Sequence, residues 1–200
     1  MSHLLEVKDL KVSYHSYAGE VQSVRGVNFT VDTGESVAIV GESGCGKSVT
    51  AKTIMGLIQT PPGEIKKGSQ ILFEGKNLLE MDERAWQAYR GSDCAIVFQD
   101  ALAALNPTLT IGHQIVEKIL IHTDMNREAA MKEAERLLTL VGIPNPARRL
   151  KQYPHEFSGG MRQRAMIAIA LACQPKLLIA DEPTTALDVT IQADIIDLLK

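Results

Sequence analysis

Apolar and polar residues alternate through the first part of the chain with the two-residue period of half-buried β-strands. The segments with strand character are residues 4–12, 27–31, 36–40, 69–73 and 94–98. Asp32, Thr33 and Gly34 supply a turn between the second and third segments, and the last segment is a short apolar run typical of a buried strand. The amino-terminal portion is therefore predicted to be rich in strands.

Apolar residues then recur with the helical period. A mostly apolar helix is expected from Lys47 to near Gly56, and the sequence Pro61-Pro62-Gly63 breaks the chain after it. Two more helical faces are predicted, one formed by Ile111, Ile115 and Ile119 and the other by Met131, Ala134, Leu138 and Val141. Because strand patterns are missing between them, residues 100–154 are predicted to form a helical insert in a sheet domain.

The last forty residues return to a helix and strand order. An apolar helix is expected over residues 161–173, and the apolar run of residues 177–180 has the character of a central parallel strand. A further helix is expected over residues 190–200. Together these patterns predict an α/β fold with a parallel core.

Composition narrows the class of protein. The 200 residues are 45% hydrophobic and 22% charged with a net charge of −3, which excludes disorder and gives no indication of nucleic acid as a partner. Cys45, Cys94 and Cys173 are widely spaced, which indicates neither a disulfide framework nor a zinc knuckle. The longest apolar run, residues 165–173, is shorter than the ~20 residues of a membrane span. A soluble chain in a reducing cytosol is expected.

A phosphate-binding loop is the most specific motif. The pattern G-x-x-x-x-G-K-[ST] is matched by Gly41, Glu42, Ser43, Gly44, Cys45, Gly46, Lys47 and Ser48. The loop lies between a predicted strand and a predicted helix, so its N–H groups and the helix N-terminus face one point where a triphosphate fits. Lys47 is expected to reach the β- and γ-phosphates and Ser48 to coordinate Mg²⁺. A flexible glycine loop is the alternative.

Two carboxylates follow the predicted central strand directly. Asp181 and Glu182 come immediately after residues 177–180, at the strand end where open α/β sheets bind ligands. An acidic pair alone is usually a surface feature. Together with the phosphate loop, Asp181 is the candidate for holding Mg²⁺ through water, and Glu182 for orienting and polarising the attacking water.

A Ser-Gly-Gly sequence at the start of the apolar helix completes the set. Ser158, Gly159 and Gly160 on their own are an N-cap. However, the motifs occur in the order seen in nucleotide-binding domains of ABC transporters: the phosphate loop, Gln99 after Val97 and Phe98, Ser158 to Gly160, and the acidic pair followed by Ala186, Leu187 and Asp188. The chain resembles that family over nearly its whole length.

A narrower resemblance is to the ATPase subunits of oligopeptide, dipeptide and nickel importers. It rests on residues 99–112, 153–156 and 160–164. Met161 replaces a glutamine that is common in ABC proteins, which is usual in this group, whereas Phe157 in place of leucine is a mild departure. Ala101 stands where the group generally has proline, which affects the local loop shape.

The resemblance implies a P-loop NTPase fold, the ABC-type nucleotide-binding domain, with an antiparallel β portion and a helical subdomain. The whole chain would be one domain, with residues 1–99 and 166–200 as the core and residues 100–165 as the helical subdomain. The C-terminal part is expected to be missing, because the family's switch histidine lies beyond the Asp188 loop and every histidine here precedes Asp181. Low activity of the isolated chain is expected.

The resemblance also implies roles for individual residues. Tyr14 would stack on adenine, with Tyr17 as a competitor and core packing as the alternative. Gln99 would sense Mg²⁺ and the γ-phosphate, and so joins Lys47 and Glu182 in the catalytic group. The metal set would be Ser48, Gln99 and Asp181. The residues that would meet a partner domain's nucleotide, or line the dimer interface, are Ser158, Gly159, Gly160 and Asp188.

The implied function is ATP hydrolysis that powers import of oligopeptides or dipeptides, at the cytoplasmic face of the cell membrane. The expected partners are a second ABC ATPase subunit, identical or similar, two transmembrane permease subunits and an extracytoplasmic solute-binding protein, with no nucleic acid. Three alternatives are open: a nickel or glutathione importer, a non-transport ABC protein acting on ribosomes or DNA, and a nucleotide-binding module without useful turnover.

Overall fold

The computed structural model describes residues 3–183 of the chain. The chain divides into two compact units, Met1–Gln87 and Ala88–Lys200. The predicted division into a core and a helical subdomain follows other boundaries and stays a prediction. Within residues 3–183, no helix has the length and apolar character needed to cross a membrane.

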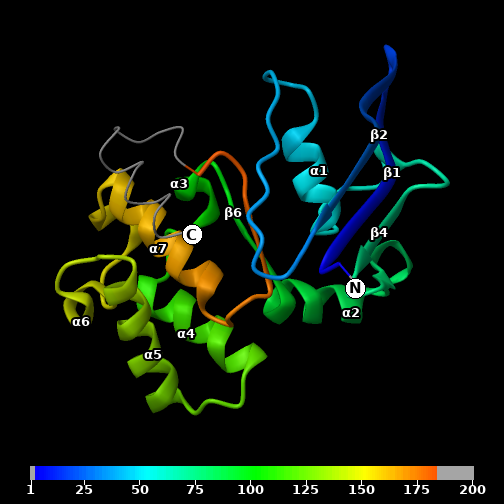
Figure 1. The fold of residues 1–200 in the computed structure, drawn as a ribbon. Coiled ribbons are helices and arrows are strands. Elements are labelled where there is room, and N and C mark those ends of the chain that lie inside the picture. The colour runs from blue at the N-terminus through cyan, green and yellow to red at the C-terminus, as the bar shows by residue number, and fades with distance from the viewer. Residues whose placement is uncertain (1–2, 184–200) are drawn as a thin grey trace. The chain divides into compact units, whose positions relative to one another are not determined.

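An antiparallel sheet forms most of the first unit (Figure 1). Its strands are β1 (Leu5–Ser16), β2 (Gly19–Val31), β3 (Gly63–Ile65), β4 (Gln70–Phe73) and β5 (Lys76–Asn77). The order is β2-β1-β4-β5, and β3 pairs with β1 beside this path. The antiparallel β portion of the predicted fold is thus present.

The apolar residues of β1 form its buried face. Leu5, Val7, Leu10 and Val12 are all at most 2% exposed. The spacing from Val7 to Leu10 is odd, and there the pairing with β2 shifts register around Asp9, whose φ is 44°. This bulge returns the side chains to the buried face after one extra residue.

The predicted strand over residues 36–40 is wrong. This stretch has no regular secondary structure, and Val40 is 87% exposed. An apolar segment of this kind needs hydrogen-bonded strands beside it to become a buried strand, and none of the strands in the described part of the chain pairs with it. The predicted strand over residues 27–31 is instead the end of β2, which already begins at Gly19.

Helix α1 (Lys47–Ile54) follows the phosphate loop, as predicted, and ends slightly before the expected Gly56. Gly56 has a φ of 63°, a left-handed conformation that ends the helix, and a Cβ there would lie 2.8 Å from the Trp86 ring. The short elements η1 (Leu78–Glu80) and α2 (Glu83–Ala88) then lead to the second unit.

A parallel pair of strands and a group of helices form the second unit (Figure 1). The strands are β6 (Cys94–Val97) and β7 (Leu177–Ala180), close to their predicted bounds. The other elements are η2 (Tyr89–Asp93), α3 (Ala101–Ala104), α4 (Ile111–His122), α5 (Arg127–Leu140), α6 (Pro146–Arg149), η3 (Pro154–Glu156) and α7 (Gly159–Leu171). The helix expected over residues 190–200 lies outside the described residues.

The core of the second unit confirms one predicted helical face and corrects the other. Ile111, Ile115 and Ile119 of α4 are fully buried, as predicted. Ala134 and Leu138 of α5 and Val141 beyond it are also buried, but Met131 is 42% exposed. The residues of α5 that face the core are Ala130, Ala134, Leu137 and Leu138. The predicted buried face therefore included Met131, whereas the adjacent Ala130 is the residue that is buried.

Candidate active site

The phosphate loop obtains its shape from two glycines. Gly44 and Gly46 have φ angles of 80° and 99°, in the left-handed region that other residues disfavour. A Cβ on Gly46 would lie 2.4 Å from the carbonyl oxygen of Ser23 in β2. Only glycine therefore allows the loop to pass this close to the strand and begin α1.

Lys47 lies at the start of α1 with its ammonium turned back over the loop. Its Nζ donates to the carbonyl oxygens of Gly41 and Glu42, both at 2.9 Å. These bonds hold a positive charge beside the loop. Gly46, the N-cap of α1, has no side chain that could cap the first turn. Positive charge and a helix N-terminus at one place form an arrangement suited to phosphate groups.

The second unit brings Gln99, Asp181 and Glu182 together at the carboxyl ends of β6 and β7. Val97 and Ala180 are paired in register, and the next N–H, that of Asp181, donates to the Val97 carbonyl at 2.9 Å. The Gln99 Nε2 donates to Glu182 Oε2 at 3.2 Å. Two segments 83 residues apart thus meet at one carboxylate.

Glu182 lies in an uncommon backbone conformation. Its φ is 50°, in the left-handed region, and its side chain is exposed. A non-glycine residue is held there only when the surrounding structure compensates for the strain, and such residues cluster at functional sites. The carboxylate is therefore fixed from its backbone as well as from Gln99.

The Ser-Gly-Gly sequence forms the N-terminus of α7. Ser158 is the N-cap, and its Oγ accepts from the Met161 N–H at 3.3 Å. A Cβ on Gly159 would meet nothing within 4 Å, so packing within the described residues does not require glycine there. The N-cap that the sequence predicts for Ser158 is therefore present. A contact of Ser158, Gly159 and Gly160 with nucleotide stays a prediction.

The predicted site residues are divided between the two units. Lys47, Ser48 and Tyr14 belong to the first unit, while Gln99, Asp181 and Ser158 to Gly160 belong to the second. Asp188 lies outside the described residues. The roles assigned to all of these residues remain predictions.

Tyr14 lies in β1 between two partner strands. It is paired with Val21 of β2 on one side and with Gly63 of β3 on the other. A Cβ on Gly63 would be 3.3 Å from the Tyr14 ring, so the ring packs closely over the β3 backbone. Tyr17, the competitor for the adenine role, lies in the turn after β1 and is fully exposed. Tyr14 thus has the more fixed position of the two.

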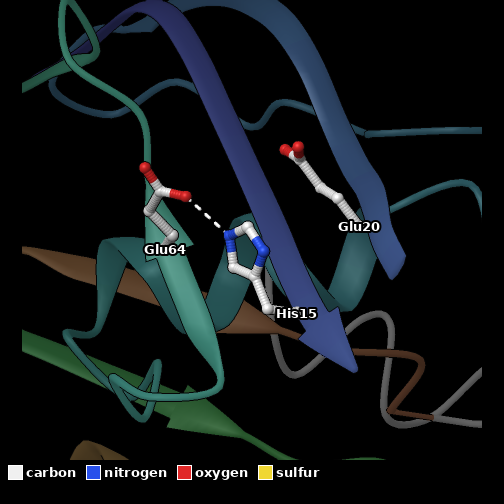
Figure 2. A group of neighbouring side chains, drawn as sticks. All are labelled: His15, Glu20 and Glu64. Atoms are coloured by element: carbon white, nitrogen blue, oxygen red, sulfur yellow. Dashed lines mark hydrogen bonds and ion pairs between the residues drawn. The ribbon is translucent and has the colours of Figure 1, made fainter. Parts of the chain in front are cut away.

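His15 of β1, Glu20 of β2 and Glu64 of β3 form a cluster of exposed charged side chains (Figure 2). His15 Nε2 lies 2.7 Å from Glu64 Oε2, and Lys66 Nζ lies 2.6 Å from Glu64 and 2.9 Å from Glu20. Lys66 and then His15 lower the pKa of Glu64, while a hydrogen bond from Ser13, followed by Lys66, lowers that of Glu20. Lys66 bridges the two carboxylates, so the cluster is a surface ion-pair network.

Sequence reasoning missed one residue near the acidic pair. Gln163 of α7 is only 4% exposed, and its Nε2 donates to the Pro183 carbonyl at 2.7 Å. The signal was available in the periodicity, because Gln163, Ile167 and Ala170 are spaced as one helical face. A polar residue in phase with buried apolar ones indicates a buried polar contact.

An open groove of about 760 Å³ lies among α4, α5 and α6. Its lining includes Leu120, Ile121 and Met131, which are 37%, 67% and 42% exposed. Exposed apolar residues grouped in this way mark interaction surfaces.

Comparison with known proteins finds one family and several relatives to which the chain is similar. The ABC transporter family matches residues 24–185. The oligopeptide transport ATP-binding protein OppD of Bacillus subtilis (strain 168) is 59% identical over 200 residues, all of this chain and 56% of that protein. The dipeptide transport ATP-binding protein DppD of the same organism is 55% identical, over all of this chain and 59% of its own length. The chain thus spans a little more than half of these relatives.

The fold comparison agrees with these matches. The ATP-binding cassette MJ0796, solved as a dimer in a post-hydrolysis state bound to ADP and Pi, is similar with a TM-score of 0.86 and 27% identity. The match covers 98% of this chain and 81% of that one. The predicted fold class is confirmed.

Proposed function

The chain belongs to the ABC transporter family, and on that premise we propose that it is the ATP-binding and hydrolysing part of an oligopeptide or dipeptide importer. The observation that supports this most strongly is the glycine-shaped loop with Lys47 over it, in a chain 59% identical to an oligopeptide transport ATP-binding protein. We propose the importer function, the substrates and the partners for the whole protein.

The phosphate loop fits a triphosphate. Gly46 supplies no side-chain cap to α1, so the N-terminus of this helix can be directed at an anion. Lys47 adds the charge that pairs with the β- and γ-phosphates, and it would exchange its two loop carbonyls for phosphate oxygens. Tyr14 would hold the adenine ring by stacking.

The acidic strand end fits the hydrolytic half of the reaction. The Glu182 carboxylate can accept a hydrogen bond from water and polarise it for attack on the γ-phosphate. The Gln99 amide holds that carboxylate, and its carbonyl oxygen is a ligand type that Mg²⁺ accepts.

The oxygen donors also fit a magnesium ion. Asp181 and the Ser48 hydroxyl are the other candidates to hold Mg²⁺, which prefers such donors. When bound, Mg²⁺ would neutralise charge on the phosphates. The donor chemistry of all three residues is therefore compatible with the proposed metal.

The proposed partners follow from the family. A second ATPase subunit would supply the Ser158 to Gly160 segment that closes on this chain's nucleotide, and the dimeric state of the similar solved cassette supports this. Two permease subunits and an extracytoplasmic solute-binding protein would complete the importer, with this chain on the cytoplasmic face of the membrane. The groove among α4, α5 and α6 supports the binding of a protein partner.

A nucleotide titration tests the binding half of the proposal. Lys47→Ala removes the charge over the loop and should weaken ATP binding by about 10- to 100-fold, the equivalent of one lost charge-assisted hydrogen-bond set. Lys52→Ala is the matched control, because Lys52 is an exposed lysine on the same helix. Equal ATP affinity in wild type and a folded Lys47→Ala variant would overturn the assignment of the loop.

Peptide uptake tests the transport half. A cell that lacks its own peptide importers should take up short peptides when the full-length protein is produced with its permease and binding partners. Uptake should disappear with Lys47→Ala and persist with Lys52→Ala. Uptake of nickel in place of peptides would move the substrate assignment to the metal importers.

A further inference from the structure

Gln163 is a buried amide whose known partner lies beside the candidate base. Its side chain leaves α7 among buried apolar residues and donates from Nε2 to the Pro183 carbonyl at 2.7 Å. Pro183 is covalently next to Glu182. A buried amide without its acceptor is unfavourable, so the bond fixes both the side chain and the carbonyl. The backbone directly after Glu182 is therefore tied to α7.

The three residues from Asp181 to Pro183 are each held by a different segment. The Asp181 N–H donates to Val97 at the end of β6, and the Glu182 carboxylate accepts from Gln99 in the following loop. The third tie, to Pro183, comes from Gln163 of α7. Because Glu182 has a φ of 50°, its backbone needs such restraints on both sides.

Helix α7 also begins with the Ser-Gly-Gly segment. Ser158 caps it, and Gln163 lies five residues further, about 7.5 Å along the helix axis at 1.5 Å per residue. An intact helix moves over that distance as one body. A displacement of Ser158 to Gly160 is therefore transmitted to the carbonyl of Pro183 through one hydrogen bond.

We propose that Gln163 is a positioning residue that couples the Ser158 to Gly160 segment to the carboxylate of Glu182. The inference rests on the proposed ATPase function and adds a residue to which that proposal gives no role. When the segment closes on a nucleotide, α7 moves with it, and Gln163 sets the backbone from which Glu182 reaches the attacking water. Gln163 does not touch the nucleotide.

Two substitutions remove the donor and keep the volume. Gln163→Met replaces the amide with an apolar chain of similar length, and Gln163→Glu keeps the shape but offers an acceptor to the Pro183 carbonyl at neutral pH. Gln174→Met is the matched control, because Gln174 is exposed and follows the same helix. ATPase kinetics of the full-length protein should show kcat lower by about 10- to 100-fold in both variants, with KM within about twofold of wild type.

Hydrogen exchange gives a readout that does not depend on turnover. Amides of residues 177–182 should exchange faster in both Gln163 variants than in wild type and Gln174→Met, while amides of residues 41–50 stay unchanged. If one of the two Gln163 variants folds poorly, the exchange pattern of the other variant still tests the proposal.

The outcomes separate this inference from the proposed function. Wild-type kcat in a folded Gln163 variant, while Glu182→Gln loses turnover, would overturn the role of Gln163 and leave the ATPase proposal standing. A fall in melting temperature with unchanged kcat would reduce Gln163 to a packing residue. Turnover unaffected by Glu182→Gln would overturn the proposed site, and the inference with it.

Discussion

The phosphate loop and the acidic strand end are built in opposite ways. The loop takes its shape from neighbours in sequence: two left-handed glycines and a lysine that bonds to carbonyls five and six residues away. The strand end is assembled from distant segments, with Gln99 reaching Glu182 across 83 residues and Gln163 reaching Pro183 across 20. The first depends on local backbone conformation and the second on tertiary packing.

This difference determines how each region should respond to change. A substitution in the loop is expected to act mainly on the loop itself, because its glycines and Lys47 set its shape within a few residues. A substitution at the strand end acts on a set of side chains that restrain one another, so its effects on catalysis exceed its effects on nucleotide affinity. The predictions below test that contrast.

The largest effect is expected for Glu182→Gln. The amide keeps the shape and loses the carboxylate that polarises water, so kcat of the full-length protein should fall by at least about 100-fold, within the range for loss of a general base. ATP affinity should stay near wild type. Glu156→Gln, an exposed carboxylate in η3, is the control for the loss of one charge. Turnover at the wild-type rate would remove Glu182 from the mechanism.

Gly46→Ala should disturb the loop more than Gly44→Ala does. Both glycines are left-handed, which costs alanine about 1–2 kcal/mol. At Gly46 the added Cβ also meets the Ser23 carbonyl, whereas at Gly44 it meets nothing within 4 Å. Urea denaturation should show the larger loss of unfolding free energy for Gly46→Ala, together with weaker ATP binding. Equal losses would mean that the close approach to β2 has no energetic effect.

Gln99→Ala should lower kcat by about tenfold, less than the change at Glu182 itself. The variant removes the hydrogen bond to the carboxylate but leaves the backbone ties of Asp181 and Pro183 in place. Steady-state kinetics of the full-length protein measure this effect. A loss as large as that of Glu182→Gln would show that the proposed contact of Gln99 with Mg²⁺ contributes more than its hydrogen bond to Glu182.

The smallest effect concerns Lys118, which joins α4 to the end of α7. Its Nζ donates to the carbonyls of Ile169 and Ala170, at 3.1 and 3.2 Å, and burial lowers its pKa. In the unfolded chain Lys118 keeps its proton up to about pH 10.4. Between the lowered pKa of Lys118 in the folded chain and this ordinary value, the unfolded chain therefore binds more protons than the folded chain. Unfolding free energy therefore gains a contribution that rises with pH across this window.

Lys118→Met should lack that rising contribution. Burial raises the pKa of Cys94 to about 12 and also raises that of Cys173, which makes stability fall with pH in both proteins. The charge of Lys118 opposes this rise in both thiols, so its removal makes stability fall more steeply with pH in the variant, in the same direction as the loss of the lysine's own contribution. Urea denaturation at several values between pH 7 and 10 should show the difference between the two proteins grow in favour of wild type. A constant difference would contradict the assigned shift.

Local rules account for what the sequence predicted well. Helix α1 was predictable because Gly46, Lys47 and the apolar residues after them act within a few residues, and strand β7 because an apolar run before Asp181 and Glu182 has few other interpretations. The buried face of α4 followed from its period. Each of these features is decided within one helix turn or one strand.

Features that depend on distant partners were not predictable in the same way. Residues 36–40 have the composition of a strand, but a strand exists only with a hydrogen-bonded neighbour. The choice between Ala130 and Met131 on α5 depended on which helix packs against it. Gln163 was visible as a polar residue in an apolar face, but its partner Pro183 could be found only from the fold.

The central claim is that the loop and the strand end serve one nucleotide, and hydrogen exchange with and without MgATP tests it most directly. In the wild-type protein, MgATP should slow exchange in both residues 41–50 and residues 177–183. Lys47→Ala should abolish both effects at the same ATP concentration, although it changes only the loop. Protection confined to residues 41–50, with residues 177–183 unchanged by MgATP, would contradict the account.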